Sequence, residues 1–171
     1  KKYNIPTAAY ENFDTPEEAL LYLETAKYPI VLKADGLALG KGVLICNDHE
    51  EAIEGVQSIM CDKKFGTAGN KMVVEEFMTG REVSVLSFVD GKTIKTMTSA
   101  QDHKRAGDGD TGLNTGGMGT FSPSPFYTEE VDEFCKKYIY QQTVDAMAKE
   151  GREFKGIIFF GLMLTPDGPK V

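Results

Sequence analysis

Short apolar runs alternate with acid-rich segments of helical periodicity in the first half of the chain. Three apolar runs predict strands at Ile30–Leu32, Val43–Ile45 and Met72–Val74, and we expect the first two to be buried. A capping residue, a proline and two acids indicate a helix start near Asp14. A second helix is predicted over His49–Cys61, with an inner face of Ala52, Ile53, Val56, Ile59 and Met60. Two helices covering one sheet form a small α+β lobe.

The second half of the chain predicts a hairpin, a long helix and a further strand. Two apolar runs, Arg81–Val89 and Lys92–Thr98, flank an Asp-Gly pair, which is a strong hairpin signal. Ile157–Leu164 is a continuous apolar run typical of a central strand. The longest predicted helix spans Thr128–Glu150, with an inner face of Val131, Phe134, Cys135, Tyr138, Ile139, Gln142, Val144, Met147 and Ala148.

Two segments show no helical or strand periodicity. Asp62–Lys71 is polar and contains glycine, which predicts a loop. Gln101–Pro125 mixes cations, acids and many glycines over about 25 residues. A loop of this length inside a compact domain is usually functional or disordered. We expect its part Gln101–Gly119 to be mobile without a ligand.

Composition restricts the class of protein. The chain has 171 residues, 41% hydrophobic and 26% charged, which is ordinary for one globular domain or two small lobes. A net charge of −7 argues against a nucleic-acid surface, although a few lysines can still form a local anion site. Cys46, Cys61 and Cys135 fit no zinc spacing and predict reduced thiols in a cytoplasmic protein. No apolar run reaches the roughly 18 residues of a membrane span.

A glycine-rich turn joins the first two of the predicted strands. Lys33 lies inside the first strand, and a bare ammonium there needs an anionic partner. Gly36, Gly40 and Gly42 permit close backbone approach to a ligand, and free N–H groups with Lys41 suit a polyphosphate. The spacing is not that of a P-loop, because three residues separate the first two glycines and a glycine follows the lysine. A hairpin with a surface lysine is the alternative interpretation.

A strand end offers groups that suit a nucleoside. The third predicted strand runs into Glu75-Glu76-Phe77-Met78, where backbone groups can pair with a purine edge and two apolar side chains can contact its ring. Glu82 begins the next strand and can accept hydrogen bonds from ribose hydroxyls. A surface acidic pair beside an ordinary hairpin is the alternative.

Charged residues gather at the start of Gln101–Pro125. Arg105 can clamp a phosphate with two hydrogen bonds, or it can belong to a solvated turn. The run that begins at Asp108 does not match an EF-hand calcium loop. Gly112 and Gly119 stand at positions 5 and 12, which need oxygen ligands, and Leu113 stands at position 6, which needs glycine. No nucleophile with a paired base is visible. The candidate chemistry is therefore positioning and charge neutralisation of phosphates.

Four segments together resemble the phosphoribosylamine–glycine ligase family of ATP-grasp enzymes: VLKADGLALGKGV, VVEEFMTGREVSV, AQDHKRAGDGDTGLNTGGMGTFSPSP and FKGIIFFGLMLTPDGPKV. Gln101–Gly119 is the specific part, because other ATP-grasp ligases share the lysine strand and the acidic segment but not this loop. The resemblance implies an α+β ATP-grasp fold. Its small lid lobe would span residues 1–71, and residues 72–171 would form part of the larger antiparallel-sheet lobe, with some ATP contacts between the two.

The resemblance also implies roles for individual residues. The ATP phosphates would be held by Lys33, Gly36, Gly40, Lys41 and Gly42. The adenine would contact Glu75, Glu76, Phe77 and Met78, and the ribose would contact Glu82. The phosphoribosylamine and glycine side would be lined by Asp102, Lys104, Arg105, Asp110, Asn114, Gly116, Gly117 and Met118, with Arg105 and Asp110 as catalytic residues.

The implied reaction is the ligation of glycine to 5-phosphoribosylamine, which yields glycinamide ribonucleotide, ADP and phosphate. ATP would convert the glycine carboxylate to an acyl phosphate, and the amine would displace phosphate, with Mg²⁺ (or Mn²⁺) neutralising charge. The family has a lobe before the equivalent of Lys1 and metal ligands beyond the equivalent of Val171. We therefore expect a fragment that is inactive alone, from a parent that is a monomer or is fused to other purine enzymes.

Other functions stay open at the level of sequence. One is another ATP-grasp carboxylate–amine ligase, such as a purine-pathway carboxylase. Another is a non-catalytic nucleotide-binding module, and a third is a glycine-rich interaction domain without a nucleotide. We expect neither a nucleic acid nor a membrane as a partner.

Overall fold

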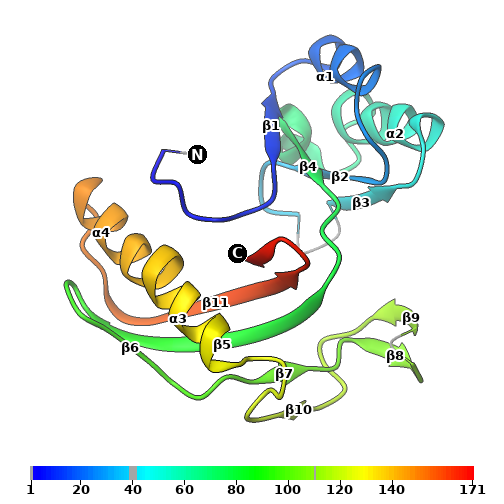
Figure 1. Cartoon of the computed structure of the whole chain (residues 1–171). Coiled ribbons are helices and arrows are strands. Elements are labelled where there is room, and N and C mark those ends of the chain that lie inside the picture. The colour runs from blue at the N-terminus through cyan, green and yellow to red at the C-terminus, as the bar shows by residue number, and fades with distance from the viewer. Residues whose placement is uncertain (1, 39–41, 110) are drawn as a thin grey trace. The chain divides into compact units, whose positions relative to one another are not determined.

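The computed structural model describes residues 2–38, 42–109 and 111–171, and only the backbone of residues 113 and 114. The predicted site residues Gly40, Lys41 and Asp110 lie outside the described residues. The chain forms two compact units (Figure 1). The smaller unit is Ala8–Met78, and the larger combines Lys1–Thr7 with Thr79–Val171. Because strand β4, Met72–Glu76, belongs to the smaller unit, this division lies seven residues beyond the predicted lobe boundary at Lys71, and the assignment of family lobes stays a prediction.

Four antiparallel strands form the sheet of the smaller unit, in the order β1-β4-β2-β3. Their bounds are Tyr10–Phe13, Ile30–Ala34, Val43–Cys46 and Met72–Glu76 for β1 to β4. Two helices pack against this sheet: α1, Pro16–Leu23, and α2, His49–Val56 (Figure 1). The side chains of Thr15 and Asp48 accept hydrogen bonds from the backbone N–H of Glu18 and Glu51. These caps explain why each helix begins where the sequence predicts it.

The helices cover one face of the sheet. Strand residues of alternating position pack with helix residues into one core, which contains Ala19, Leu23, Ile30, Leu32, Cys46, Ala52, Val56, Ile59, Met60, Met72 and Val74. Val43 and Ile45 are exposed, so the prediction that this strand is buried is wrong. The cause is the two-residue period of a strand, which turns them away from the helices. Ile53 is also exposed rather than inward.

Two short helical segments differ from the predicted pattern. The second helix reaches Cys61 as expected, but its last turn, Gln57–Cys61, is a π-helix. The expected loop between residues 62 and 71 contains a 3₁₀ helix, Gly66–Asn70. Helices of this kind need few residues and carry little amphipathic signal, so periodicity does not reveal them.

The sheet of the larger unit has the order β12-β11-β5-β6. Its long strands are β5, Arg81–Asp90, and β11, Lys155–Thr165, and its short strands are β6, Ile94–Thr96, and β12, Gly168–Lys170. The hairpin between β5 and β6 confirms the Asp-Gly prediction. Strand β11 lies between β5 and β12, as expected for a central strand. Val171 donates a 2.9 Å backbone hydrogen bond to the Pro6 carbonyl, which joins the first residues of the chain to this unit.

One long helical segment crosses a face of this sheet (Figure 1). It consists of α3, Glu129–Cys135, a π turn, Lys136–Tyr140, and α4, Gln141–Lys149. The core beneath it contains Val83, Val85, Cys135, Ile139, Tyr140, Phe160 and Leu162. The predicted inner residue Tyr138 is exposed, whereas Tyr140 is fully buried. The π turn adds a residue and so shifts the helical phase.

The opposite face of this sheet carries apolar side chains that are open to solvent. Leu86 and Phe88 on β5 stand opposite Phe159 and Ile157 on β11, and Phe159 is 61% exposed. The apolar run of β11 therefore buries only alternate residues.

In the described part of the chain, no helix is long and apolar enough to cross a membrane.

The long glycine-rich segment contains strands that its sequence does not predict. Strand β7, Gln101–Asp102, pairs with β10, Thr120–Phe121, and β8, Arg105–Gly107, pairs with β9, Thr111–Asn114. All four are short, and backbone hydrogen bonds hold them rather than a buried face. Hydrophobic alternation is therefore no guide to them.

The three cysteines should differ sharply in reactivity. Burial raises the pKa of the Cys46 and Cys135 thiols to about 11, whereas Cys61 is exposed. Since the thiolate is the nucleophile, we expect one thiol to react rapidly with a disulfide reagent at pH 8 in the folded protein, and three after denaturation. Cys61→Ser should abolish the rapid reaction. Two or three thiols reacting at similar rates in the native protein would contradict this.

Candidate nucleotide and substrate site

The partner that Lys33 needs is a carboxylate of the same unit. Strands β2 and β4 are antiparallel neighbours, with Lys33 opposite Val73 and Val31 opposite Glu75. The two-residue period therefore places Lys33 and Glu75 on the same face of the sheet, the face away from α1 and α2. Their Nζ and Oε2 atoms lie 2.5 Å apart, and the side chains are 39% and 21% exposed. Lys33 is thus partly exposed rather than buried, and its charge has a partner without a phosphate.

Packing explains two of the predicted phosphate-loop glycines. A Cβ atom on Gly36 would lie 2.8 Å from Cα and Cβ of Ala68, in the 3₁₀ helix. Gly42 is buried, and a Cβ there would lie 2.7 Å from Cβ of Ala38. Its carbonyl accepts a 2.8 Å hydrogen bond from the backbone N–H of Ala34. Glycine is therefore required at these positions whether or not a ligand binds, and their contact with phosphate stays a prediction.

The segment predicted to contact adenine ends the smaller unit. Glu75 and Glu76 are the last residues of β4, and the unit finishes at Met78. The backbone N–H of Glu76 donates a 2.9 Å hydrogen bond to the Ala9 carbonyl, and Phe77 is exposed. A pocket of about 240 Å³ next to this segment is lined by residues that include Ile30 and Glu76 but not Lys33 or Phe77. We do not assign the nucleotide to that pocket.

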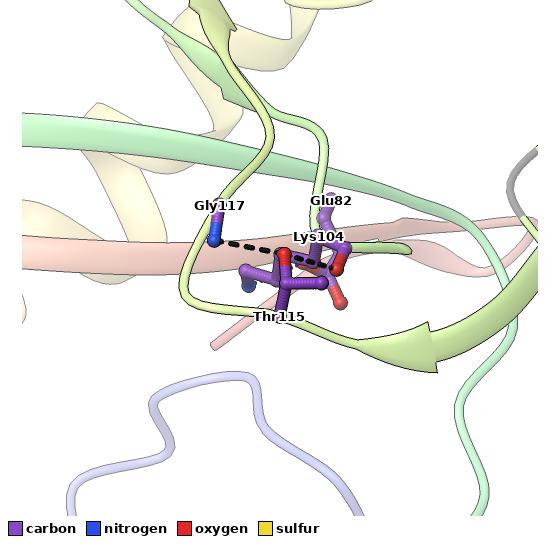
Figure 2. A network of polar contacts seen from close by, with 4 residues as sticks. All are labelled: Glu82, Lys104, Thr115 and Gly117. Atoms are coloured by element: carbon purple, nitrogen blue, oxygen red, sulfur yellow. Dashed lines mark hydrogen bonds and ion pairs between the residues drawn. The ribbon is translucent and has the colours of Figure 1, made fainter. Parts of the chain in front are cut away.

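Glu82 takes part in a polar network within the larger unit (Figure 2). Its Oε2 atom lies 2.5 Å from Nζ of Lys104. The carbonyl of Lys104 accepts hydrogen bonds from the backbone N–H of Thr115, at 2.6 Å, and from its hydroxyl, at 2.9 Å. The same hydroxyl accepts a 3.0 Å hydrogen bond from the Gly117 N–H. The network connects the start of β5 to the glycine-rich segment.

The structure gathers other predicted substrate residues around this network. Gly117 has φ +119°, and a Cβ there would lie 2.9 Å from Oδ1 of Asp102. That oxygen is buried and has no hydrogen-bond partner within the described part of the chain. Arg105 stands opposite Asn114 in the β8–β9 ladder, and its guanidinium donates a 3.1 Å hydrogen bond to the Gly112 carbonyl.

Two of the predicted residues contribute exposed surface to this region. Met118 is exposed while its backbone N–H donates to the His103 carbonyl, and Gly116 has open space around it. Sequence reasoning included Thr115 only as part of the stretch Asn114–Met118 on the substrate side, and it gave no role to the hydroxyl, which both donates and accepts in the network. A threonine directly before two glycines is a weak turn signal and the single local hint of its role.

The described residues do not fit a metal site of their own. Among residues 2–38, 42–109 and 111–171, no three carboxylate, thiol or imidazole side chains gather closely enough to hold a metal ion. Mg²⁺ often takes one or two carboxylates and fills its remaining positions with phosphate oxygens and water.

Comparison with known proteins identifies the family. The family model of the phosphoribosylglycinamide synthetase ATP-grasp (A) domain matches residues 1–171. The chain belongs to this family. A crystal structure of the phosphoribosylamine–glycine ligase from Thermotoga maritima matches this ATP-grasp domain with a TM-score of 0.86 at 37% identity, covering 99% of this chain and 43% of that one. The predicted α+β ATP-grasp fold is confirmed.

Two sequence relatives of this phosphoribosylglycinamide synthetase domain are longer proteins, and the matching region is only part of each. A bifunctional purine biosynthetic protein of Pichia angusta is 51% identical over 172 residues, which cover 100% of this chain and 22% of that protein. The phosphoribosylamine–glycine ligase of a Streptococcus pyogenes strain is 48% identical over 170 residues, which cover 99% of this chain and 40% of that protein. The chain thus spans less than half the length of these relatives.

The packing role of Gly36 can be separated from any role in binding. We expect Gly36→Ala to lower the free energy of unfolding by about 1–3 kcal/mol, because the new methyl group meets the backbone of Ala68. Gly116→Ala is the control, since nothing lies within 4 Å of the added atom. It should change stability by less than about 0.5 kcal/mol in urea denaturation. Equal effects of the two substitutions would argue against the packing role.

Proposed function

We propose that the protein carrying this domain is a phosphoribosylamine–glycine ligase. ATP converts the carboxylate of glycine to glycyl phosphate, and the amine of 5-phosphoribosylamine then displaces phosphate to give glycinamide ribonucleotide. The observation that supports this most strongly is the family match over residues 1–171, together with relatives of that name at about half identity. A relative named as a bifunctional purine biosynthetic protein supports an activity in purine synthesis and fusion of the intact protein to other domains.

Three sets of residues are proposed to contact the nucleotide. Its phosphates contact Lys33 and the turn glycines with Lys41, its adenine contacts the segment from Glu75 to Met78, and its ribose contacts Glu82. The ammonium of Lys33 supports this, because it has three N–H donors and the described ion pair with Glu75 uses one. In this proposal the lid lobe is residues 1–71 and the larger lobe begins at residue 72. Mg²⁺ or Mn²⁺ accompanies ATP, with ligands supplied from outside the described residues.

The other two substrates are proposed to bind along the glycine-rich segment, with Arg105 and Asp110 closest to the reacting groups. Arg105 is exposed, and its guanidinium donates to one backbone carbonyl, so further N–H donors stay available for the 5′-phosphate. This side is completed by Asp102, Lys104, Asn114, Gly116, Gly117 and Met118.

Free thiols support a cytoplasmic location, where cysteines stay reduced.

Nucleotide binding is the first test. Titration of ATP with Mg²⁺ into this chain should give saturable binding that Lys33→Met and Glu82→Gln each weaken by about tenfold or more, because each removes a charge-assisted contact. Lys95→Met and Glu17→Gln alter exposed charges outside the proposed site and should leave affinity unchanged. If this chain does not bind, the product of the complete reading frame is titrated in the same way. Absence of binding there would sink the nucleotide proposal.

Substrate identity is tested with the product of the complete reading frame. We expect phosphate release from ATP that requires both glycine and 5-phosphoribosylamine, and loss of that release with Arg105→Met. Release with a different acid and amine would favour another ATP-grasp ligase. Nucleotide binding without release for any such pair would favour a non-catalytic module. This chain alone should release no phosphate, and substrate-dependent release by it would contradict that expectation.

A further inference from the structure

The Glu82–Lys104 ion pair joins two parts of the larger unit that are assigned to different substrates. Glu82 begins β5, while Lys104 lies between β7 and β8 in the glycine-rich segment. Their charged atoms are 2.5 Å apart, and their side chains are 52% and 45% exposed. An ion pair this exposed contributes little to folding. Its main structural effect is that the Lys104 ammonium fixes the position of the Glu82 carboxylate.

We propose that Lys104 is a positioning residue that orients the Glu82 carboxylate for the ribose of the bound nucleotide. This inference rests on the proposed contact between Glu82 and the ribose. A carboxylate offers about four lone-pair positions on two oxygens. Lys104 occupies Oε2, and the described residues donate no hydrogen bond to Oε1. The carboxylate can therefore accept hydrogen bonds from ribose hydroxyls while the ammonium holds it in place.

Positioning raises affinity because it lowers the entropy lost on binding. A glutamate that is half exposed at a strand end samples several rotamers, and fixing such a side chain is part of the cost of binding. The ion pair restricts that freedom before the nucleotide arrives. The benefit is confined to groups that contact Glu82, so it falls on the ribose hydroxyls rather than on the phosphates or the base.

The backbone of Lys104 is itself held by the fold of the glycine-rich segment. Both hydrogen bonds from Thr115 end on the carbonyl of Lys104, and the Thr115 hydroxyl also accepts from Gly117 (Figure 2). The backbone at Lys104 is therefore tied to the stretch proposed to bind phosphoribosylamine and glycine. A change in the conformation of that stretch would therefore move the backbone of Lys104 and alter how its ammonium holds the Glu82 carboxylate.

The test compares ATP with 2′,3′-dideoxy-ATP, which lacks both ribose hydroxyls. Binding of each to the product of the complete reading frame is measured by calorimetry. Lys104→Met should weaken ATP binding about two- to fivefold, the range expected for an exposed ion pair, and leave dideoxy-ATP binding unchanged. Lys104→Arg should restore most of the preference for ATP. The exposed Lys95→Met is the control for loss of one positive charge.

A double variant measures whether Lys104 acts through Glu82. Glu82→Gln should remove most of the preference for ATP over dideoxy-ATP, and adding Lys104→Met to it should cause no further loss. Thr115→Val keeps the shape of threonine but loses the hydroxyl bonds, and it should reduce the preference by a smaller factor than Lys104→Met. Thermal unfolding of each variant shows whether it has folded.

The outcomes separate this inference from the proposed function. If Glu82→Gln keeps the full preference for ATP, the ribose assignment is wrong and the inference fails with it. If Glu82→Gln loses the preference but Lys104→Met does not, the ribose assignment stands and the positioning role is overturned. If Lys104→Met weakens ATP and dideoxy-ATP equally, the lysine acts on the phosphates or on the overall charge, and the inference is again overturned.

Discussion

The larger unit depends on one contact, the antiparallel pairing of β5 with β11. The register runs from Lys155 opposite Asp90 to Leu164 opposite Arg81, and it joins strands that are far apart in the sequence. Alternate residues of the pair fill the core beneath the long helix. The same alternation places Glu82 on the other face, so a slip of one residue would turn this carboxylate toward the core. Core packing and the orientation of a proposed ligand group are thus set by one register.

The elements that could be predicted from the sequence carry a local chemical signal. The Asp-Gly hairpin and the helix starts at Thr15 and Asp48 are set by residues within a few positions of each other. The π turn at Lys136–Tyr140 and the ladders of the glycine-rich segment carry no such signal. Their residues form ordinary helical or loop-like patterns, and long-range packing or backbone pairing decides the outcome.

For the candidate site, residue types could be predicted but their partners could not. An anionic partner for Lys33 could be predicted from its charge inside an apolar run, although the side chain is partly exposed, whereas its pairing with Glu75 follows from the register of β2 and β4. Glu82 and Lys104 were both identified, but for different ligands, because their contact depends on how the glycine-rich segment folds back. Lys33 and Lys104 already have carboxylate partners, so any phosphate that either lysine binds must share the ammonium with that carboxylate or displace it.

The smaller unit is inserted between Thr7 and Thr79 of the larger one, and this has a consequence for synthesis on the ribosome. The smaller unit is contiguous, so it is complete as soon as Met78 has emerged. Strand β5 can pair early with β6 along one edge but must wait for β11 along the other, and until then its core residues Val83 and Val85 lack Phe160 and Leu162, which they pack with in the finished fold. The nascent larger unit is therefore the part most prone to aggregate or to need chaperones, and slower translation ahead of β11 would prolong that exposure.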